Sequence, residues 1–128
     1  MCLLQFLVQS DECTSIRRMC FKGIWPTAPR DFVVSTTWFE DPEDNSLYIV
    51  SRSASDDYCP QQKGYVRGHI NISGYWIQPI ARDGKDSYRM TLVAHTELGG
   101  TLPSSVVNML STSAPLKMLA TIGDILKR

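Results

Sequence analysis

The chain has 128 residues, enough for one domain with a substantial core, and its thirteen basic and thirteen acidic side chains leave no net charge. This balance excludes the strongly basic surface of a nucleic-acid-binding protein and the polybasic segment that attaches proteins to anionic membranes. No apolar run is long enough to cross a bilayer, and the four cysteines and two histidines form no metal-ligand or nucleophile motif, so we expect no enzyme, metal or cofactor.

The N-terminus and the cysteines indicate a reducing compartment. Residues 1–8 are apolar but short, have no cationic start, and are soon followed by Asp11 and Glu12, so a signal peptide is not expected. The cysteines form no Cys-x-x-Cys pair, and free thiols are the simplest interpretation. We therefore expect a cytoplasmic protein.

Alternation of apolar and polar residues predicts about seven mostly antiparallel strands. They fall at residues 3–8, 14–22, 31–39, 47–55, 64–71, 74–80 and 88–97. Residues 23–29 contain two prolines and a glycine and form an irregular connection. Residues 41–45 are an acidic turn, residues 56–63 a longer loop, and Ile72-Ser73 is expected to join two paired strands.

One long C-terminal helix follows Leu98-Gly99-Gly100. Pro103 suits its first position, and Lys127 and Arg128 complement its dipole at the other end. Apolar residues recur at three- and four-residue spacing and share one face, namely Val106, Val107, Leu110, Ala114, Leu119, Ile122, Ile125 and Leu126. Pro115 removes one intrahelical hydrogen bond, which predicts a kink near Ala114.

The predicted elements differ greatly in width. Seven strands spaced by about 4.8 Å make a sheet roughly 30 Å wide. One helix is about 10 Å across and covers about a third of one sheet face. The rest of that face must therefore be hollow and filled by a ligand, or covered by a piece outside this chain, or both.

A family resemblance rests on residues 22–33, where Trp25-Pro26 and Arg30-Asp31-Phe32 resemble the signature of START domains. These are lipid-transfer domains related to the steroidogenic acute regulatory protein. Further stretches resemble the family in the same order, at residues 11–14, 62–68, 76–80, 99–103, 107–108 and 114–115. The chain is similar to the C-terminal part of a START domain along residues 1–128.

The resemblance implies an α+β helix-grip fold, in which a curved antiparallel sheet of about six to seven strands packs on one long C-terminal helix. The N-terminal helix and first strands of the family fold would be missing from this chain. The family implies non-enzymatic binding and transfer of one sterol, phospholipid or other lipid, held in an apolar tunnel under the helix. Expected partners are the lipid, a transiently contacted membrane surface, and either a protein or further domains of a longer parent; nucleic acid is not expected.

Strand and helix periodicity selects the tunnel wall if Thr36 faces inward, although a one-residue slip would exchange each strand residue for its neighbour. The expected lipid-binding residues are Val34, Thr36, Trp38, Ile49, Ser51, Ser53, Trp76, Gln78, Ile80, Met90, Leu92, Ala94, Val107, Leu110, Ala114 and Met118. The expected gate consists of hinges and an opposing lip, at Gly99, Gly100, Pro115, Tyr58 and Pro60.

Ligand specificity should come from the few inward polar groups, because an unpaired one costs about 1–3 kcal/mol. Sterol-carrying members of the family have an arginine at the position of Thr36. Ceramide carriers have an asparagine at the position of Ser51 and a tyrosine at that of Leu92. Gln78 and Ser51 remain as candidate hydrogen-bonding groups, or are satisfied by buried water or by each other.

Two other hypotheses stay open. The chain could be a degenerate START-like fragment that acts as a protein-interaction or regulatory module through an open sheet edge. It could also be an enzyme of the wider helix-grip class, although the sequence offers no catalytic pair for that.

Overall fold

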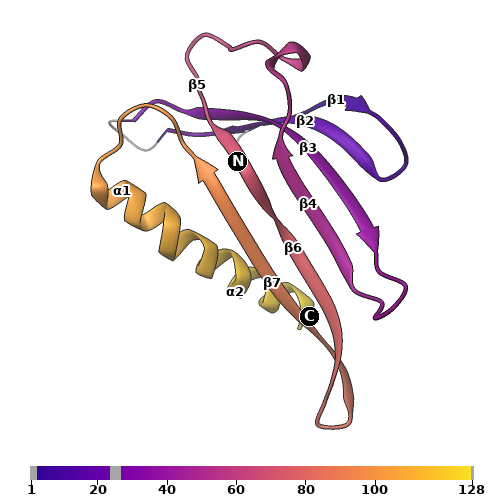
Figure 1. Ribbon diagram of the computed structural model, residues 1–128. Helices are drawn as coiled ribbons and strands as arrows, with labels where there is room; N and C mark the ends of the chain where they lie inside the picture. The colour runs from indigo at the N-terminus through magenta and orange to yellow at the C-terminus, as the bar shows by residue number, and fades with distance from the viewer. Residues whose placement is uncertain (1–2, 24–26, 128) are drawn as a thin grey trace.

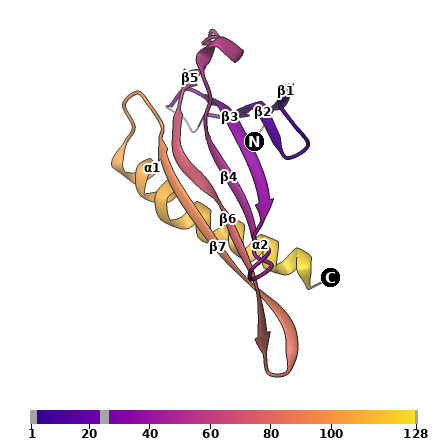
Figure 2. The same cartoon turned by 45° about the vertical axis from the view of Figure 1, so that its right-hand side comes forward.

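The computed structural model describes residues 3–23 and 27–127 as one sheet with a helix along one face (Figures 1 and 2). The strands are β1 (Leu3–Gln9), β2 (Thr14–Phe21), β3 (Arg30–Glu40), β4 (Leu47–Ser53), β5 (Val66–Arg67), β6 (His69–Arg82) and β7 (Lys85–Glu97). The helical segments are the 3-10 turn η1 (Asp56–Tyr58), α1 (Ser104–Asn108), the π-helical turn η2 (Met109–Ser113) and α2 (Ala114–Leu126). This confirms the expected helix-grip class; Trp25-Pro26 of the connection lies outside the described residues.

Neighbours in the sheet follow the order of the chain. The order is β1-β2-β3-β4-β6-β7, and each neighbouring pair is antiparallel. The short strand β5 is the exception, because it pairs in parallel with the start of β3, with Val66 opposite Arg30. β1 and β7 therefore form the two edges of the described sheet.

Strand β6 runs without interruption through Ile72 and Ser73, so the turn expected there is wrong. A two-residue hairpin needs positive backbone φ angles, which an Ile-Ser pair does not favour. The register with β7 instead shifts between Ile70 and Ile72, which marks a β-bulge. The tight turn between these strands lies at Asp83 and Gly84, whose φ angles are 52° and 72°.

The C-terminal helix departs from α geometry at the place predicted from Pro115. Proline has no backbone N–H, so the α-helical bond from residue 115 to the carbonyl of Ser111 cannot form. The preceding N–H, that of Ala114, donates to the carbonyl of Met109, one residue further back than in an α-helix. The whole segment still runs along one face of the sheet beside β6 and β7 (Figure 2).

The buried core is small and lies where β3 crosses the start of β6. Phe32, Val34 and Ile70 form it, with Met19 and Leu98 packed against them. Ile16 and Val33 are also buried, whereas many other large apolar side chains are exposed, for instance Phe6 of β1 and Ile125 of α2. The helix covers only part of the sheet, in agreement with the width expected from the sequence.

Candidate functional site

A cavity of about 690 Å³ lies between the sheet and the C-terminal helix. Its helical wall consists of Val106, Leu110, Ala114 and Met118, which are spaced by four, with Pro115 beside them and Leu102 just before α1. Its sheet wall includes Met19, Phe21, Arg30, Phe32, Ser51, Ile70, Ser73, Tyr75, Leu92, Ala94 and Thr96, with Leu98 just after β7. The volume falls in the range of sites that hold small organic molecules, and most lining side chains are apolar.

The structure brings part of the predicted wall together around this cavity. The predicted residues that line it are Ser51, Leu92, Ala94, Leu110, Ala114 and Met118, together with the predicted hinge Pro115. They come from β4, β7 and the helix, three elements that the periodicity treated separately. Whether these side chains contact a lipid stays a prediction.

Strand β6 presents the opposite face from the one predicted. Tyr75 pairs with Ile49 and Leu92 in the sheet and lines the cavity. Its neighbour Trp76 stacks on Tyr48, with ring centroids 5.9 Å apart, beside a smaller hollow of about 230 Å³. The inward orientation expected for Trp76, Gln78 and Ile80 is therefore wrong by one residue, because residues directly opposite each other share a face and it is Tyr75, not Trp76, that lies opposite Ile49 and Leu92.

The remaining predicted wall residues lie outside the cavity lining. Val34 is buried in the core, and Ser53 accepts a hydrogen bond from the N–H of Ile70. The Thr36 hydroxyl lies 2.8 Å from that of Ser51. Ile49 borders the smaller hollow, and Trp38 and Val107 are exposed. Met90 is half-buried and lies before Leu92 in β7.

The predicted lip residues lie on the loop that precedes β5, and neither of them lines the cavity. Tyr58 ends the turn η1 and is exposed. The carbonyl of Pro60 accepts hydrogen bonds from Arg67 and Gln62. This loop is thus attached to the sheet through Arg67, and the gate role of its residues remains a prediction.

Arg30 attaches the corner between β7 and the helix to the start of β3. Its Nε, Nη1 and Nη2 atoms donate to the carbonyls of Leu98, Ala28 and Gly99 at 3.2, 2.7 and 3.0 Å. Gly99 and Gly100 have φ angles of 67° and 63°, in the region that favours glycine. The predicted hinge is therefore a glycine corner whose carbonyls are bound by one arginine.

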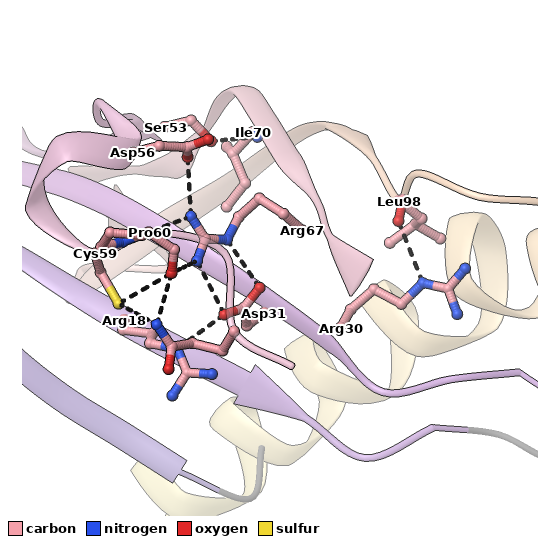
Figure 3. Close-up of polar contacts among 11 residues, drawn as sticks. Arg18, Arg30, Asp31, Ser53, Asp56, Cys59, Pro60, Arg67, Ile70 and Leu98 are labelled. Carbon is pink, nitrogen blue, oxygen red and sulfur yellow. Dashed lines mark hydrogen bonds and ion pairs between the residues drawn. The ribbon is translucent and has the colours of Figure 1, made fainter. Parts of the chain in front are cut away.

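A buried ionic cluster lies on the side of β3 away from the cavity, since Asp31 alternates with the lining residues Arg30 and Phe32 (Figure 3). Arg18 Nε and Arg67 Nε each donate to the Asp31 carboxylate at 2.8 Å. Arg67 also donates to Asp56 Oδ1 at 2.9 Å. Sequence patterns gave no sign of this cluster apart from a charged residue at the start of an apolar strand.

Burial alone would raise the pKa of Asp31, but hydrogen bonds from Arg67 and Arg18 and their positive charges outweigh it and lower this pKa. The hydrogen bond to Asp31 raises the pKa of Arg67, against the opposing effect of burial. For Arg18, burial favours a lower pKa, and its contacts with Asp31 reverse the direction. All three groups are thus charged at neutral pH.

The ion pairs of Asp31 with Arg18 and Arg67 should make the stability of the domain depend on pH. An aspartate in an unfolded chain titrates near about 3.9, and the folded pKa of Asp31 lies lower. The stabilisation is therefore complete above about pH 4 and is lost as pH falls through the folded pKa. Urea midpoints between pH 7 and pH 3 should show this fall, and the Asp31→Asn variant should lose that part of it; an equal fall in both proteins would contradict the assignment.

The described residues show neither a metal cluster nor a membrane span. Among residues 3–23 and 27–127, no three His, Cys, Asp or Glu side chains gather in a way that could hold an ion. No helical segment within those ranges combines the length and hydrophobicity needed to traverse a bilayer.

The fold is that of one known class of domain. Residues 5–127 match the family model of the START domain, and the chain belongs to that family. An uncharacterised protein of Pseudomonas aeruginosa is 32% identical over 95 residues, which are 74% of this chain and 45% of that protein. Human StAR-related lipid transfer protein 5 is 26% identical over 101 residues, 79% of this chain and 46% of that protein.

A solved structure gives the same fold. The chain superposes on human STARD10 with a TM-score of 0.77 at 22% identity, over 92% of this chain and 46% of that one. The chain thus spans about half the length of the curated relatives it matches.

Proposed function

We propose that the chain is a non-enzymatic module that binds one lipid molecule in the cavity beneath its C-terminal helix and transfers it between membranes. The observation that supports this is the apolar cavity of about 690 Å³ between the sheet and the helix. The relative named StAR-related lipid transfer protein 5 supports the same class of ligand. The lipid could be a sterol, a phospholipid or another single lipid.

The energetics suit a carrier. Each buried lipid CH₂ contributes about 0.8 kcal/mol, so a chain of about a dozen carbons supplies on the order of 10 kcal/mol of transfer free energy. Removal from a membrane costs a similar amount, so net affinity stays modest and the lipid can be released. Entry would require transient contact with a membrane surface and displacement of the helix about the Gly99-Gly100 corner.

Two adjacent helix residues give a sharp test. Leu110 lines the cavity, whereas Met109 is 40% exposed and does not. Leu110→Arg should place a charge in the apolar cavity and weaken binding of a fluorescent sterol or of labelled phosphatidylcholine by about tenfold or more. Met109→Arg should leave both affinities close to that of the original chain, as measured by fluorescence titration.

Two results would overturn the proposal. One is a purified protein that carries no lipid detectable by mass spectrometry and binds neither probe. The other is an equal loss of binding in both arginine variants, because a loss at Met109 cannot come from blocking the cavity.

A second function is favoured by the two free edges of the described sheet. β1 exposes Leu3, Leu4, Phe6 and Val8, and the outer edge of β7 pairs with no described strand. Such edges can accept a strand from another protein. A chain that binds no lipid and elutes from size-exclusion chromatography as a single species only with a partner would favour this interaction module over the carrier.

A further inference from the structure

The described polar residues that line the cavity are Lys22, Thr27, Arg30, Ser51, Ser73, Tyr75 and Thr96, and several of them already have hydrogen-bond partners. The Ser51 hydroxyl is hydrogen-bonded to Thr36. Three nitrogens of Arg30 donate to backbone carbonyls. The described lining contains no carboxylate that could pair with a cationic ligand, and its other charged residue is the exposed Lys22.

Tyr75 differs from the hydroxyl-bearing residues Ser73 and Thr96 of the sheet wall because its hydroxyl is bonded to a residue of the helix. It is half-buried in the middle of β6, and its hydroxyl donates to Met118 Sδ of α2 at 3.5 Å. A thioether sulfur is a weak acceptor, and an oxygen acceptor would bind the same hydroxyl more strongly. The Tyr75 donor therefore reaches across the cavity between sheet and helix with a contact that a ligand oxygen can replace at little cost.

We propose that Tyr75 determines specificity in this cavity, by donating its hydroxyl hydrogen bond to the uncharged oxygen of a neutral lipid that carries an alcohol or carbonyl group. This inference rests on the proposed lipid-binding function and names the ligand class for the same cavity. The lipid oxygen displaces Met118 Sδ from the tyrosine hydroxyl, while the hydrocarbon part contacts apolar lining residues such as Leu92 and Leu110.

The test uses two probes that differ in hydrogen-bonding ability. The hydrocarbon 1,6-diphenylhexatriene becomes fluorescent in apolar cavities and has no hydrogen-bonding group, so it reports on the cavity alone. Dodecan-1-ol, supplied from cyclodextrin, displaces it and reports on the polar contact. Tyr75→Phe should keep the affinity for diphenylhexatriene within about twofold and weaken dodecanol about three- to tenfold, the loss expected for one neutral hydrogen bond.

Two further variants separate recognition from packing. Tyr88 is 73% exposed and lies outside the cavity lining, so Tyr88→Phe should leave both affinities unchanged. Met118→Leu keeps a similar volume and frees the tyrosine hydroxyl, so dodecanol should bind at least as tightly as to the original chain. A Met118→Leu variant that loses dodecanol as strongly as Tyr75→Phe would show that the contact only packs helix against sheet, and would overturn the inference.

The remaining outcomes distinguish the inference from the function beneath it. If diphenylhexatriene fails to bind the original chain, the result contradicts both the proposed lipid-binding function and the role of Tyr75. If diphenylhexatriene binds but Tyr75→Phe leaves the affinity for dodecanol unchanged, the result contradicts only the role of Tyr75. The inference is also overturned if dodecanoate binds more tightly than dodecanol and this preference disappears in Lys22→Gln, because the head group would then be recognised by Lys22.

Discussion

Replacing Asp31 by asparagine is expected to lower the free energy of unfolding by about 3–5 kcal/mol, a large part of the stability of a small domain. Asp31 is 0% exposed, and its carboxylate is paired with Arg18 and Arg67, whose side chains are each 8% exposed. Asparagine keeps the volume but removes the negative charge that faces Arg18 and leaves Arg67 with only the exposed carboxylate of Asp56. Urea unfolding at pH 7, followed by circular dichroism, measures the change.

Asp56 provides the matched control. Its carboxylate also accepts a hydrogen bond from Arg67, but its side chain is 61% exposed. An exposed ion pair contributes about 0–1 kcal/mol, so Asp56→Asn should shift the urea midpoint little. Equal shifts of the urea midpoint in the two asparagine variants would show that the effect of Asp31 on stability does not come from the burial of its ion pairs.

Replacing Phe32 by alanine is expected to cost about 3–5 kcal/mol through lost burial and the cavity left behind. Its ring is 4% exposed, packs edge-on against Phe21 with centroids 5.8 Å apart, and belongs to the buried core with Val34 and Ile70. Gly68 lies between β5 and β6, and a Cβ added to it would lie 2.2 Å from Phe32 Cε1. The absence of a side chain at this position therefore leaves room for the Phe32 ring. Few other buried side chains could compensate for the loss.

Phe39 is the control for this second variant. It lies further along β3, is 48% exposed, and stacks on Tyr48 with centroids 4.8 Å apart. Phe39→Ala should cost only about 1 kcal/mol, the contribution of one exposed aromatic pair. If the midpoint of Phe39→Ala falls as far as that of Phe32→Ala, the core of this domain does not lie where β3 crosses β6.

The predictable part of the site consists of the strands in which successive side chains alternate strictly between the two faces of the sheet. In β4 and β7 the inward face follows from a period of two, and Ser51, Leu92 and Ala94 line the cavity as expected. Phe32 could have been found by extending the same alternation two residues back from Val34. The family resemblance supplied the helix-grip arrangement, which periodicity alone does not specify.

What the sequence did not show depends on long-range geometry. In β6, Tyr75 and not Trp76 faces the cavity, because it lies opposite Ile49 and Leu92, a register that alternation within one strand does not specify. On the helix, Val106 rather than Val107 faces the cavity, which a four-residue spacing through Leu110 would have selected. Asp31 and Arg67 are 36 positions apart, and nothing local links a charged residue to so distant a partner.

The order of strands in the sheet has a consequence for how the domain folds. Because β1, β2 and β3 each pair with the next strand along the chain, β4 pairs with β6 and β6 pairs with β7, most sheet contacts close short loops and cost little chain entropy. The exceptions are the pairing of β5 with β3 and the bonds from Arg30 to the carbonyls of Leu98 and Gly99, which join segments far apart in sequence. We therefore expect the hairpins to assemble early and the C-terminal helix to dock last, so that the ligand cavity arises only in the final step of folding.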